Sequence, residues 1–337
     1  MKKYILIFIL ILPIFVMAEL SNIDPDFTGL GTRYIGMGES GIALLSNNDA
    51  IIHNPARLMN SDKEFQVTME NSAQLDLVNH NFVAYSKRAP RWSAWAVGAV
   101  YSGDEAMSDI TGYFSYNFIK SREGIFSLMP RQMNLGLSLK YFGKFYGNNS
   151  SGSYVDNDNL NHQVSGSAHG FGIDVASVYR FNPEHFFTVV LKNGLSGIWW
   201  SSENEVGTAE GDYQEGKPVS LKLGYGYKSD RFIFTSDYQP ATASDLDSNL
   251  SLGFEYYLVY DKLALRSGYK RDIFSGNNEK IGIGTGISQK LNKRVAFHLD
   301  IAYQIVTSWQ GHNNLLISLT LSNPNREYRV KGRRVNK

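Results

Sequence analysis

The sequence contains no cysteine, has almost no net charge and shows no long apolar run after its first residues. Zero cysteine excludes disulfides, thiolate metal sites, a cysteine nucleophile and a lipid-modified cysteine. A formal net charge of +1 gives no global attraction to nucleic acid. A membrane-spanning helix needs about 18 apolar residues, and no stretch beyond the N-terminus reaches that length. The composition therefore argues against a helical membrane protein.

The first 18 residues have the parts of a secretory signal peptide. Lys2 and Lys3 form a basic start, residues 4–15 form an apolar stretch, and residues 16–18 offer small side chains to signal peptidase. We expect residues 1–18 to be removed by cleavage after Ala18, with an uncleaved anchor helix as the alternative. Export without cysteine suits a bacterial outer-membrane protein.

Segments of roughly ten residues with alternating apolar and small or polar side chains fill the chain from about residue 64 to 322. In residues 217–228, KPVSLKLGYGYK, Leu221, Leu223 and Tyr225 fall on one face, and lysine and glycine fall on the other. Roughly ten such residues cross a bilayer core when the strand is tilted. The repeated pattern predicts an all-β fold, a closed antiparallel transmembrane β-barrel at residues 63–323 with its apolar face outward.

The breaks between these segments predict about 14 strands, an even number as in bacterial single-chain barrels. Short breaks such as 229–230 and 260–261 alternate with longer ones, as expected when one end of the barrel faces the periplasm. The break at 120–130 departs from this rule, because it is long at a short-turn position. The breaks predicted to be long are 71–80, 102–109, 144–167, 195–216 (with Trp199 and Trp200), 240–248, 272–278 and 305–313.

Glycine is frequent on the predicted inward face, where it weakens a strand unless something needs the space. We therefore expect the lumen to be filled, and residues 19–62 are the candidate plug. Within them, Asn54 before Pro55 reads as a helix cap followed by proline at the first helical position. The inward glycines are Gly136, Gly170, Gly172, Gly224, Gly226, Gly253, Gly268, Gly282, Gly284 and Gly286.

Charged residues on neighbouring strands are also predicted to face the lumen. Opposite charges on adjacent strands pair at cross-strand distance, so these residues would hold the wall together or anchor the plug rather than line a substrate path. Arg33 in the plug is a candidate partner for Asp237 or Glu255. The predicted charge ladder is Lys222, Asp237, Glu255, Arg266 and Asp300.

Motifs for catalysis or cofactor binding are weak. Gly36, Gly38 and Gly41 match the spacing of a dinucleotide fingerprint, but no βαβ unit surrounds them, so we interpret them as glycines of the plug. His298 and Asp300 share one face of a strand, and a polar lumen pair explains them without a catalytic role. No histidines have metal-ligand spacing, so we expect no enzyme, no cofactor and no metal.

The run GTRYIGMGESGIALLSNNDAIIHNPARL resembles the N-terminal region of FadL-like outer-membrane proteins, especially their PorV/PorQ relatives. Asn54, Pro55 and Ala56 match the Asn-Pro-Ala triplet of that family, and LKLGYGY, GFEYYL and LALRSGYK are similar to PorV-type strands. The resemblance implies a barrel of about 14 strands with an N-terminal hatch inside. The chain departs from the common outer-membrane pattern at its end, where a basic tail at residues 324–337 follows the last strand.

The resemblance implies passive transport of small hydrophobic molecules across the bacterial outer membrane. The alternative it leaves open is a PorV-like binding platform or shuttle for exported proteins. Expected partners are outer-membrane lipid and either hydrophobic small molecules or exported proteins, with no nucleic acid.

Overall fold

The computed structural model describes most of the chain after residue 28. The described residues are 29–45, 47–58, 63–74, 78–89, 93–103, 107–119, 133–146, 154–155, 161–162, 164–204, 211–242, 248–259, 262–273, 279–292, 295–307 and 313–323. The predicted signal peptide and the basic tail lie outside these residues. Within these ranges the structure has no helix with both the length and the apolar content needed to cross a membrane.

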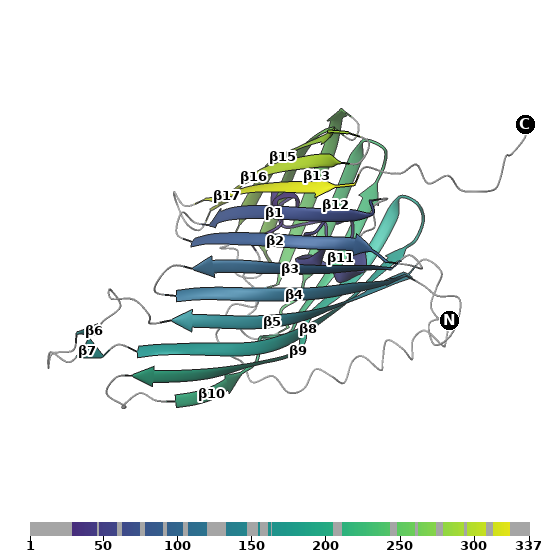
Figure 1. Cartoon of the computed structure of the whole chain (residues 1–337). Coiled ribbons are helices and arrows are strands. Elements are labelled where there is room, and N and C mark those ends of the chain that lie inside the picture. Colours follow the sequence, from purple (N-terminus) through teal and green to yellow (C-terminus); the bar gives the residue numbers. More distant parts are fainter. Residues whose placement is uncertain are drawn as a thin grey trace, which may run out of the picture.

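Fourteen antiparallel strands of the described chain form one closed barrel (Figure 1), which confirms the predicted fold class. The ring closes because β1 pairs with β17 from Gln66 opposite Ser322 to Ala73 opposite Leu315. The fourteen strands are β1 (Phe65–Gln74), β2 (Val78–Arg88), β3 (Ala94–Gly103), β4 (Met107–Ile119), β5 (Met133–Tyr146), β8 (Val164–Arg180), β9 (His185–Asn204), β11 (Ser220–Lys228), β12 (Phe232–Gln239), β13 (Asn249–Val259), β14 (Leu263–Asp272), β15 (Lys280–Lys290), β16 (Ala296–Val306) and β17 (Asn314–Ser322).

Three short strands lie beside this ring. β6 (Tyr154–Val155) and β7 (Asn161–His162) pair only with each other, and β10 (Gly211–Glu215) extends the sheet next to β9. The prediction that residues 195–216 form a loop was wrong, because β9 continues through Trp199 and Trp200 and pairs there with both β8 and β10. An irregularity in the β8–β9 pairing lies between Ile173 and Val175.

The lengths of the connections differ in part from the prediction. Only residues 75–77 separate β1 from β2, and only 104–106 separate β3 from β4, so both breaks predicted to be long are short. The reason is that the polar strand ends still pair through their backbones, for example Ala73 with Asn79. The sequence did not indicate that these strands continue, because polar side chains occur at strand ends as well as in loops.

The two faces of each strand differ as the alternation predicts. In β17, Leu315, Ile317 and Leu319 are 45%, 46% and 42% exposed on the outside of the barrel. The residues between them, such as Leu316 and Ser318, face inward and are buried. An apolar outer face with a filled interior is the arrangement expected of a membrane barrel.

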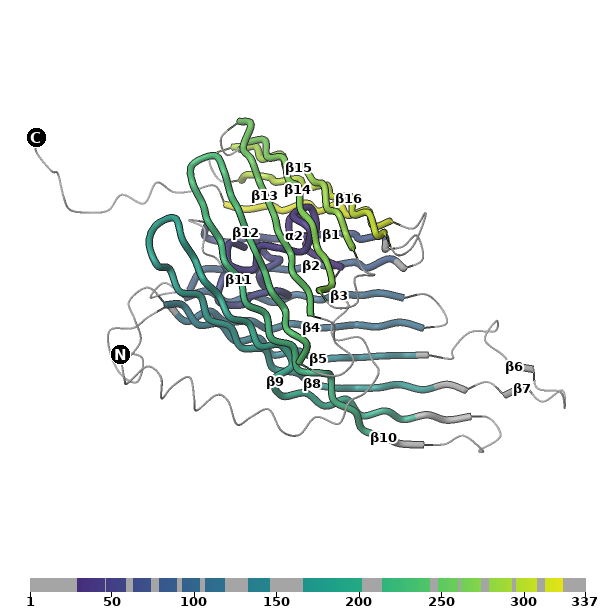
Figure 2. The backbone as a smooth tube through the Cα atoms, turned by 180° about the vertical axis from the view of Figure 1, so that it is seen from behind, coloured from purple at the N-terminus to yellow at the C-terminus, as the bar shows by residue number. Residues whose placement is uncertain are grey.

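The described residues 29–45 and 47–58 form a segment inside the barrel, here called the internal segment (Figure 2). It contains the short helices α2 (Thr32–Gly36) and α3 (Ala50–His53), followed by one turn of 3-10 helix, η2 (Pro55–Arg57). α2 packs against β14–β17, whereas α3 packs against β3 and β4, and η2 packs against β4, β5 and β8. The internal segment therefore contacts the barrel wall on opposite sides of the lumen.

Candidate functional site: the internal segment and the barrel wall

Glycines of the wall let the backbone of the internal segment lie directly on the strands. A Cβ atom at Gly268 would lie 2.1 Å from the carbonyl carbon of Met37, and one at Gly282 would lie 2.1 Å from the carbonyl oxygen of Ile35. Gly38 has a φ of +69° and lies against the backbone of Gly268, so both partners lack a side chain at the contact. A larger residue at these positions would displace the chain, since real Cβ atoms do not approach backbone this closely.

Arg33 joins the internal segment to the wall through a buried ion-pair network. Its Nε lies 2.8 Å and its second terminal nitrogen 2.9 Å from the two carboxylate oxygens of Glu255, so the pair is bidentate. Arg266 on the next strand lies 2.5 Å from Glu255 and 2.5 Å from Asp300. Burial opposes the charge on Arg33, but Glu255 outweighs it and raises the pKa of this guanidinium.

Gly286 opens the path between Arg266 and Asp300. These residues lie on β14 and β16, with β15 between them, and a Cβ at Gly286 would lie 2.4 Å from a carboxylate oxygen of Asp300. His298 also contacts Asp300, with 3.0 Å between its Nε2 and the carboxylate. Charges two strands apart therefore meet because the strand between them carries no side chain at that point.

The structure brings together only part of the predicted charge ladder. Glu255, Arg266 and Asp300 form one network with Arg33, whereas Lys222 and Asp237 contact the internal segment separately. Asp237 accepts hydrogen bonds from the backbone N–H groups of Gly41 and Ile42, at 2.8 and 3.1 Å. Lys222 donates a long hydrogen bond of 3.5 Å to the hydroxyl of Tyr34. Arg33 thus pairs with Glu255 and not with Asp237.

A second ionic contact was not predicted from the sequence. Glu39 of the internal segment lies 2.7 Å from Lys270 and 2.9 Å from Lys280, and it also accepts a hydrogen bond from Gln304. Burial disfavours ionisation of Glu39, but the two lysines outweigh burial and hold its pKa well below the usual value. Lys270 and Lys280 lie two residues from the inward glycines Gly268 and Gly282, but they were not among the predicted inward charges. Nothing in the sequence marked Glu39, which lies in an irregular turn with a φ of 59°.

Glu70 of β1 binds the start of α2. Its two carboxylate oxygens accept hydrogen bonds from the backbone N–H groups of Gly31 and Thr32, at 2.7 and 2.9 Å. The first N–H groups of a helix have no partner within the helix, so a carboxylate from the wall satisfies them. The helix thus begins where the wall supplies an acceptor.

Asn54 joins three parts of the structure through one side chain. Its Oδ1 accepts a hydrogen bond from the N–H of Ala56 at 3.1 Å, which caps η2 with Pro55 at the first helical position. Its amide donates to the carbonyl of Ile42 at 2.7 Å and to the hydroxyl of Thr188 at 2.9 Å. Asn117 of β4 donates in turn to the carbonyl of Ala56 at 2.8 Å. The Asn-Pro-Ala triplet is therefore a local turn that is also bonded to the wall.

Two titratable groups lie near α3 without an ionic partner in the described chain. Asp49 is 1% exposed and forms no ion pair with a described residue, although the side chain of Asn47 favours its ionised form. Burial raises the pKa of Asp49 to about 6. Burial also lowers the pKa of His53, whose Nε2 donates to the carbonyl of Leu30 at 2.8 Å while its ring stacks on Tyr34 at 4.1 Å.

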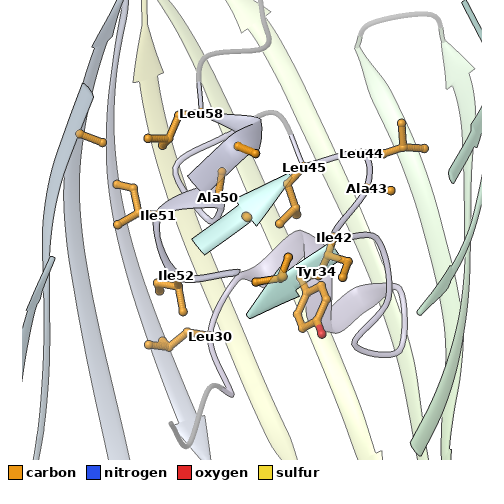
Figure 3. Close-up of a cluster of buried hydrophobic side chains, with 14 of the residues drawn as sticks. Leu30, Tyr34, Ile42, Ala43, Leu44, Leu45, Ala50, Ile51, Ile52 and Leu58 are labelled. Carbon is orange, nitrogen blue, oxygen red and sulfur yellow. The ribbon is translucent and has the colours of Figure 1, made fainter. Parts of the chain in front are cut away.

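The wall opposite α2 contributes many apolar side chains to the interior. Ile51, Ile52 and Leu58 belong to a buried cluster that also reaches β12, β16 and β17, but most of its wall side chains lie on β2, β3, β4, β8 and β9. Figure 3 shows Leu30, Ile51 and Ile52 on one side of the internal segment and Leu44 on the other. We call the members of this cluster on β2, β3, β4, β8 and β9 the apolar wall patch. They are Phe82, Ala84, Ala94, Ala96, Tyr113, Ala176, Val178, Phe186 and Val190.

The glycines of the fingerprint-like spacing have other partners. α2 ends at Gly36, and Gly36, Gly38 and Gly41 lie against Gly284, Gly268 and Met37 respectively. In the described ranges, no group of three or more His, Asp or Glu side chains is placed to hold a metal ion.

Comparisons with known proteins show the fold. No family model matches the chain, and no curated protein matches it. The CymD monoaromatic hydrocarbon channel is similar in structure, with a TM-score of 0.57 and 14% identity over 89% of this chain and 98% of that chain. The Pseudomonas putida toluene transporter TodX has a TM-score of 0.57 and 14% identity over 88% and 98% of the two chains. A Pseudomonas aeruginosa FadL homologue has a TM-score of 0.55 and 11% identity over 87% and 98%.

The chain therefore has the FadL-type fold, a closed barrel of fourteen strands. The closer resemblance to PorV and PorQ remains a prediction from the sequence.

Proposed function

We propose that this protein is a bacterial outer-membrane barrel through which small hydrophobic molecules pass passively, with the internal segment as its plug. The observation that carries the proposal is the apolar wall patch, which faces Ile51, Ile52 and Leu58 in a lumen whose other side is charged and rich in glycine. The outward apolar face of the strands supports placement in a membrane. The likeness to structures described as a hydrocarbon channel and a toluene transporter supports the kind of cargo.

The mechanism follows from how the two sides of the plug are held. The apolar wall patch is at most 9% exposed, so passage requires the contact between it and the α3 side of the plug to open. Once open, it presents methyl, methylene and aromatic groups. Burial of apolar area against such a surface is worth about 25 cal/mol per Å², so hydrophobic molecules partition into the path and move down their gradient.

Uptake of a hydrophobic probe by intact cells tests the proposal. The dye N-phenylnaphthylamine fluoresces when it reaches membrane interior, and it enters slowly across an intact outer membrane. Cells of a host without such channels should take it up several-fold faster when they produce the protein. Ala96→Leu adds a bulky side chain to the apolar wall patch and should slow this uptake, because Ala96 is fully buried at the contact.

Val97→Leu is the matched control, because Val97 neighbours Ala96 on β3 but is 41% exposed on the outer face. It should leave uptake unchanged, and the heat-dependent mobility of both variants on a gel verifies that they fold. Equal uptake with and without the protein would contradict a channel. An exported protein bound at the cell surface would then favour the alternative, a binding platform.

A further inference from the structure

Basic residues gather at the end of the barrel where β8 is followed by β9, β11 by β12 and β13 by β14. We call the last two residues of each strand at this end, with the adjoining described turn residues, the short-turn rim. It contains eight basic and three acidic residues. The acidic residues are Glu64, Glu184 and Asp230, and the basic residues are Lys63, Lys87, Arg88, Arg180, Lys228, Arg231, Lys262 and Lys290.

Most of these basic residues are in phase with the inward face of their strands. Arg180 follows buried Val178 on β8 by two positions, and Lys262 precedes buried Ala264 on β14 by two. Side chains two apart share a face of a strand, so the same reasoning applies around the ring. Six of the eight follow this phase: Arg88, Arg180, Lys228, Arg231, Lys262 and Lys290. These six rim charges therefore surround the mouth of the lumen, whereas Lys63 and Lys87 lie on the outward phase.

At the opposite end of the barrel, several cations form ion pairs with carboxylates. There Lys144 pairs with Asp109 at 3.6 Å, Arg271 pairs with Glu279 at 3.4 Å, and Lys270 and Lys280 pair with Glu39. At the short-turn rim, five exposed cations have no carboxylate partner within the described chain. They are Lys87, Arg180, Arg231, Lys262 and Lys290.

The positive charge extends from the rim into the plug. Arg57 of η2 is 5% exposed and lies over the ring of Phe186 at 5.3 Å, and Arg180 lies over the same ring at 5.7 Å. Burial lowers the pKa of Arg57 to about 9, and the charges of Arg33 and Arg180 lower it further in the same direction. The mouth and the end of the plug thus share one positive region.

We propose that the short-turn rim is a docking surface for an acidic soluble protein of the periplasm. The inference rests on the proposed function, which places this end in the periplasm, where short turns of such barrels lie. A hydrophobic molecule that leaves the lumen enters water, and a protein docked at the mouth would receive it without exposure. Complementary charge would steer that protein to the mouth and make its association sensitive to salt.

Lipid head groups are a weaker fit to the same charges. Outward positions at this end carry aromatic side chains such as Phe187 and Tyr227, which suit the boundary of a bilayer. Six of the eight rim cations lie on the other phase of the strands. An anionic lipid would therefore meet the aromatic residues before it reached the basic ones.

Site-specific cross-linking in the native host tests this proposal. A photoreactive amino acid at Lys262 or Lys290 should capture a periplasmic protein with an acidic surface in living cells. That protein, purified, should bind the purified barrel with a Kd that weakens at least several-fold from low to high salt. The triple variant Arg180→Glu, Arg231→Glu, Lys262→Glu should lose both the cross-link from position 290 and the binding.

Two controls keep the result specific. The photoreactive amino acid at Leu265, which is 46% exposed on the outer face of β14, should capture lipid only. Arg271→Glu, a charge reversal at the opposite end, should leave binding intact. Capture of lipid alone at Lys262 and Lys290, or binding that neither salt nor the triple variant changes, would overturn the proposal. Docking without uptake of the hydrophobic probe would refute the channel but not the docking surface, and uptake without docking would do the reverse.

Discussion

Arg33 and Arg266 reach the carboxylate of Glu255 from the internal segment and from the wall, at 2.8 and 2.5 Å. Without Arg33, the single positive charge of Arg266 faces two carboxylates, Glu255 and Asp300, so the buried network keeps one uncompensated negative charge. We expect Arg33→Met to lower the free energy of unfolding by about 3 kcal/mol, measured by urea denaturation in detergent. Arg33→Lys keeps the charge but loses the bidentate contact, so its loss should be smaller. An unchanged denaturation midpoint in Arg33→Met would show that the plug is not held by this pair.

Asp49 should make stability depend on pH in the opposite direction from a paired carboxylate. Its pKa is raised from 3.8 to about 6, so the folded protein binds the proton more tightly than the unfolded chain does. Above pH 6 the ionised, buried carboxylate therefore destabilises the fold by about 3 kcal/mol, and this penalty disappears as the pH falls towards 4.

Asp49→Asn should consequently be more stable than the original protein at pH 7.5 and similar to it near pH 4. Urea denaturation of both proteins across this pH range measures the difference. A difference that does not change with pH would mean that Asp49 is not a buried, unpaired carboxylate.

At the scale of elements, α2 fits its wall through missing side chains. Gly268 and Gly282 on β14 and β15 meet the backbone of Met37 and Ile35, and Gly286 lets Arg266 reach Asp300. The inward glycines thus have two roles. Some leave space for the backbone of the internal segment, and Gly286 leaves space for the contact between Arg266 and Asp300. Both uses offset the cost of glycine in a strand.

The sequence predicted the strands better than their ends. Alternation of two residues marks a membrane strand directly, so the number and faces of the strands followed from sequences such as residues 217–228. The continuation of β9 through Trp200 was missed, because its small and polar residues after Gly194 resemble a loop. Pairing with β8 and β10 holds that segment as a strand, and no local pattern shows which partners a strand finds.

Contacts of the internal segment were harder to predict for a related reason. Arg33 was one of few charges in a glycine-rich segment, so an acidic partner in the lumen was expected, but the choice of Glu255 depends on height along the barrel axis. Glu39 and Glu70 gave no signal at all. Their partners, Lys270 and Gly31, lie 231 and 39 residues away along the chain, and only the closed ring brings them together.

For the whole molecule, the two sides of the internal segment are held by different forces. Glu39 and Arg33 fasten the α2 side to β13–β16 through ion pairs, whereas the α3 side meets the wall mainly through apolar contacts and neutral hydrogen bonds. Loss of one partner of a buried ion pair lowers stability by several kcal/mol. A neutral hydrogen bond contributes only about 1 kcal/mol to stability. The α3 side should therefore separate from the wall first.

Engineered disulfides test this difference, since the chain has no cysteine of its own. The hydroxyls of Ser40 and Thr235 lie 2.8 Å apart on the α2 side, and the side chains of Asn48 and Ser86 are in contact at 2.5 Å on the α3 side. Two cysteines at either site would face each other across a contact between the internal segment and the wall, and gel mobility without reductant verifies that the disulfide has formed. We expect Ser40→Cys with Thr235→Cys to leave uptake of the hydrophobic probe unchanged, because that side does not need to move.

Asn48→Cys with Ser86→Cys should instead slow uptake in its oxidised form and recover on addition of a reductant. The recovery separates a blocked movement from a damaged fold, because reduction restores the freedom of the plug without replacing either residue. The two tethers are matched, since each joins the same plug to a neighbouring strand through one bond. If the tether on the α2 side blocked uptake and the one on the α3 side did not, the ion pairs would lie on the moving side, and the path would follow the glycine-rich wall.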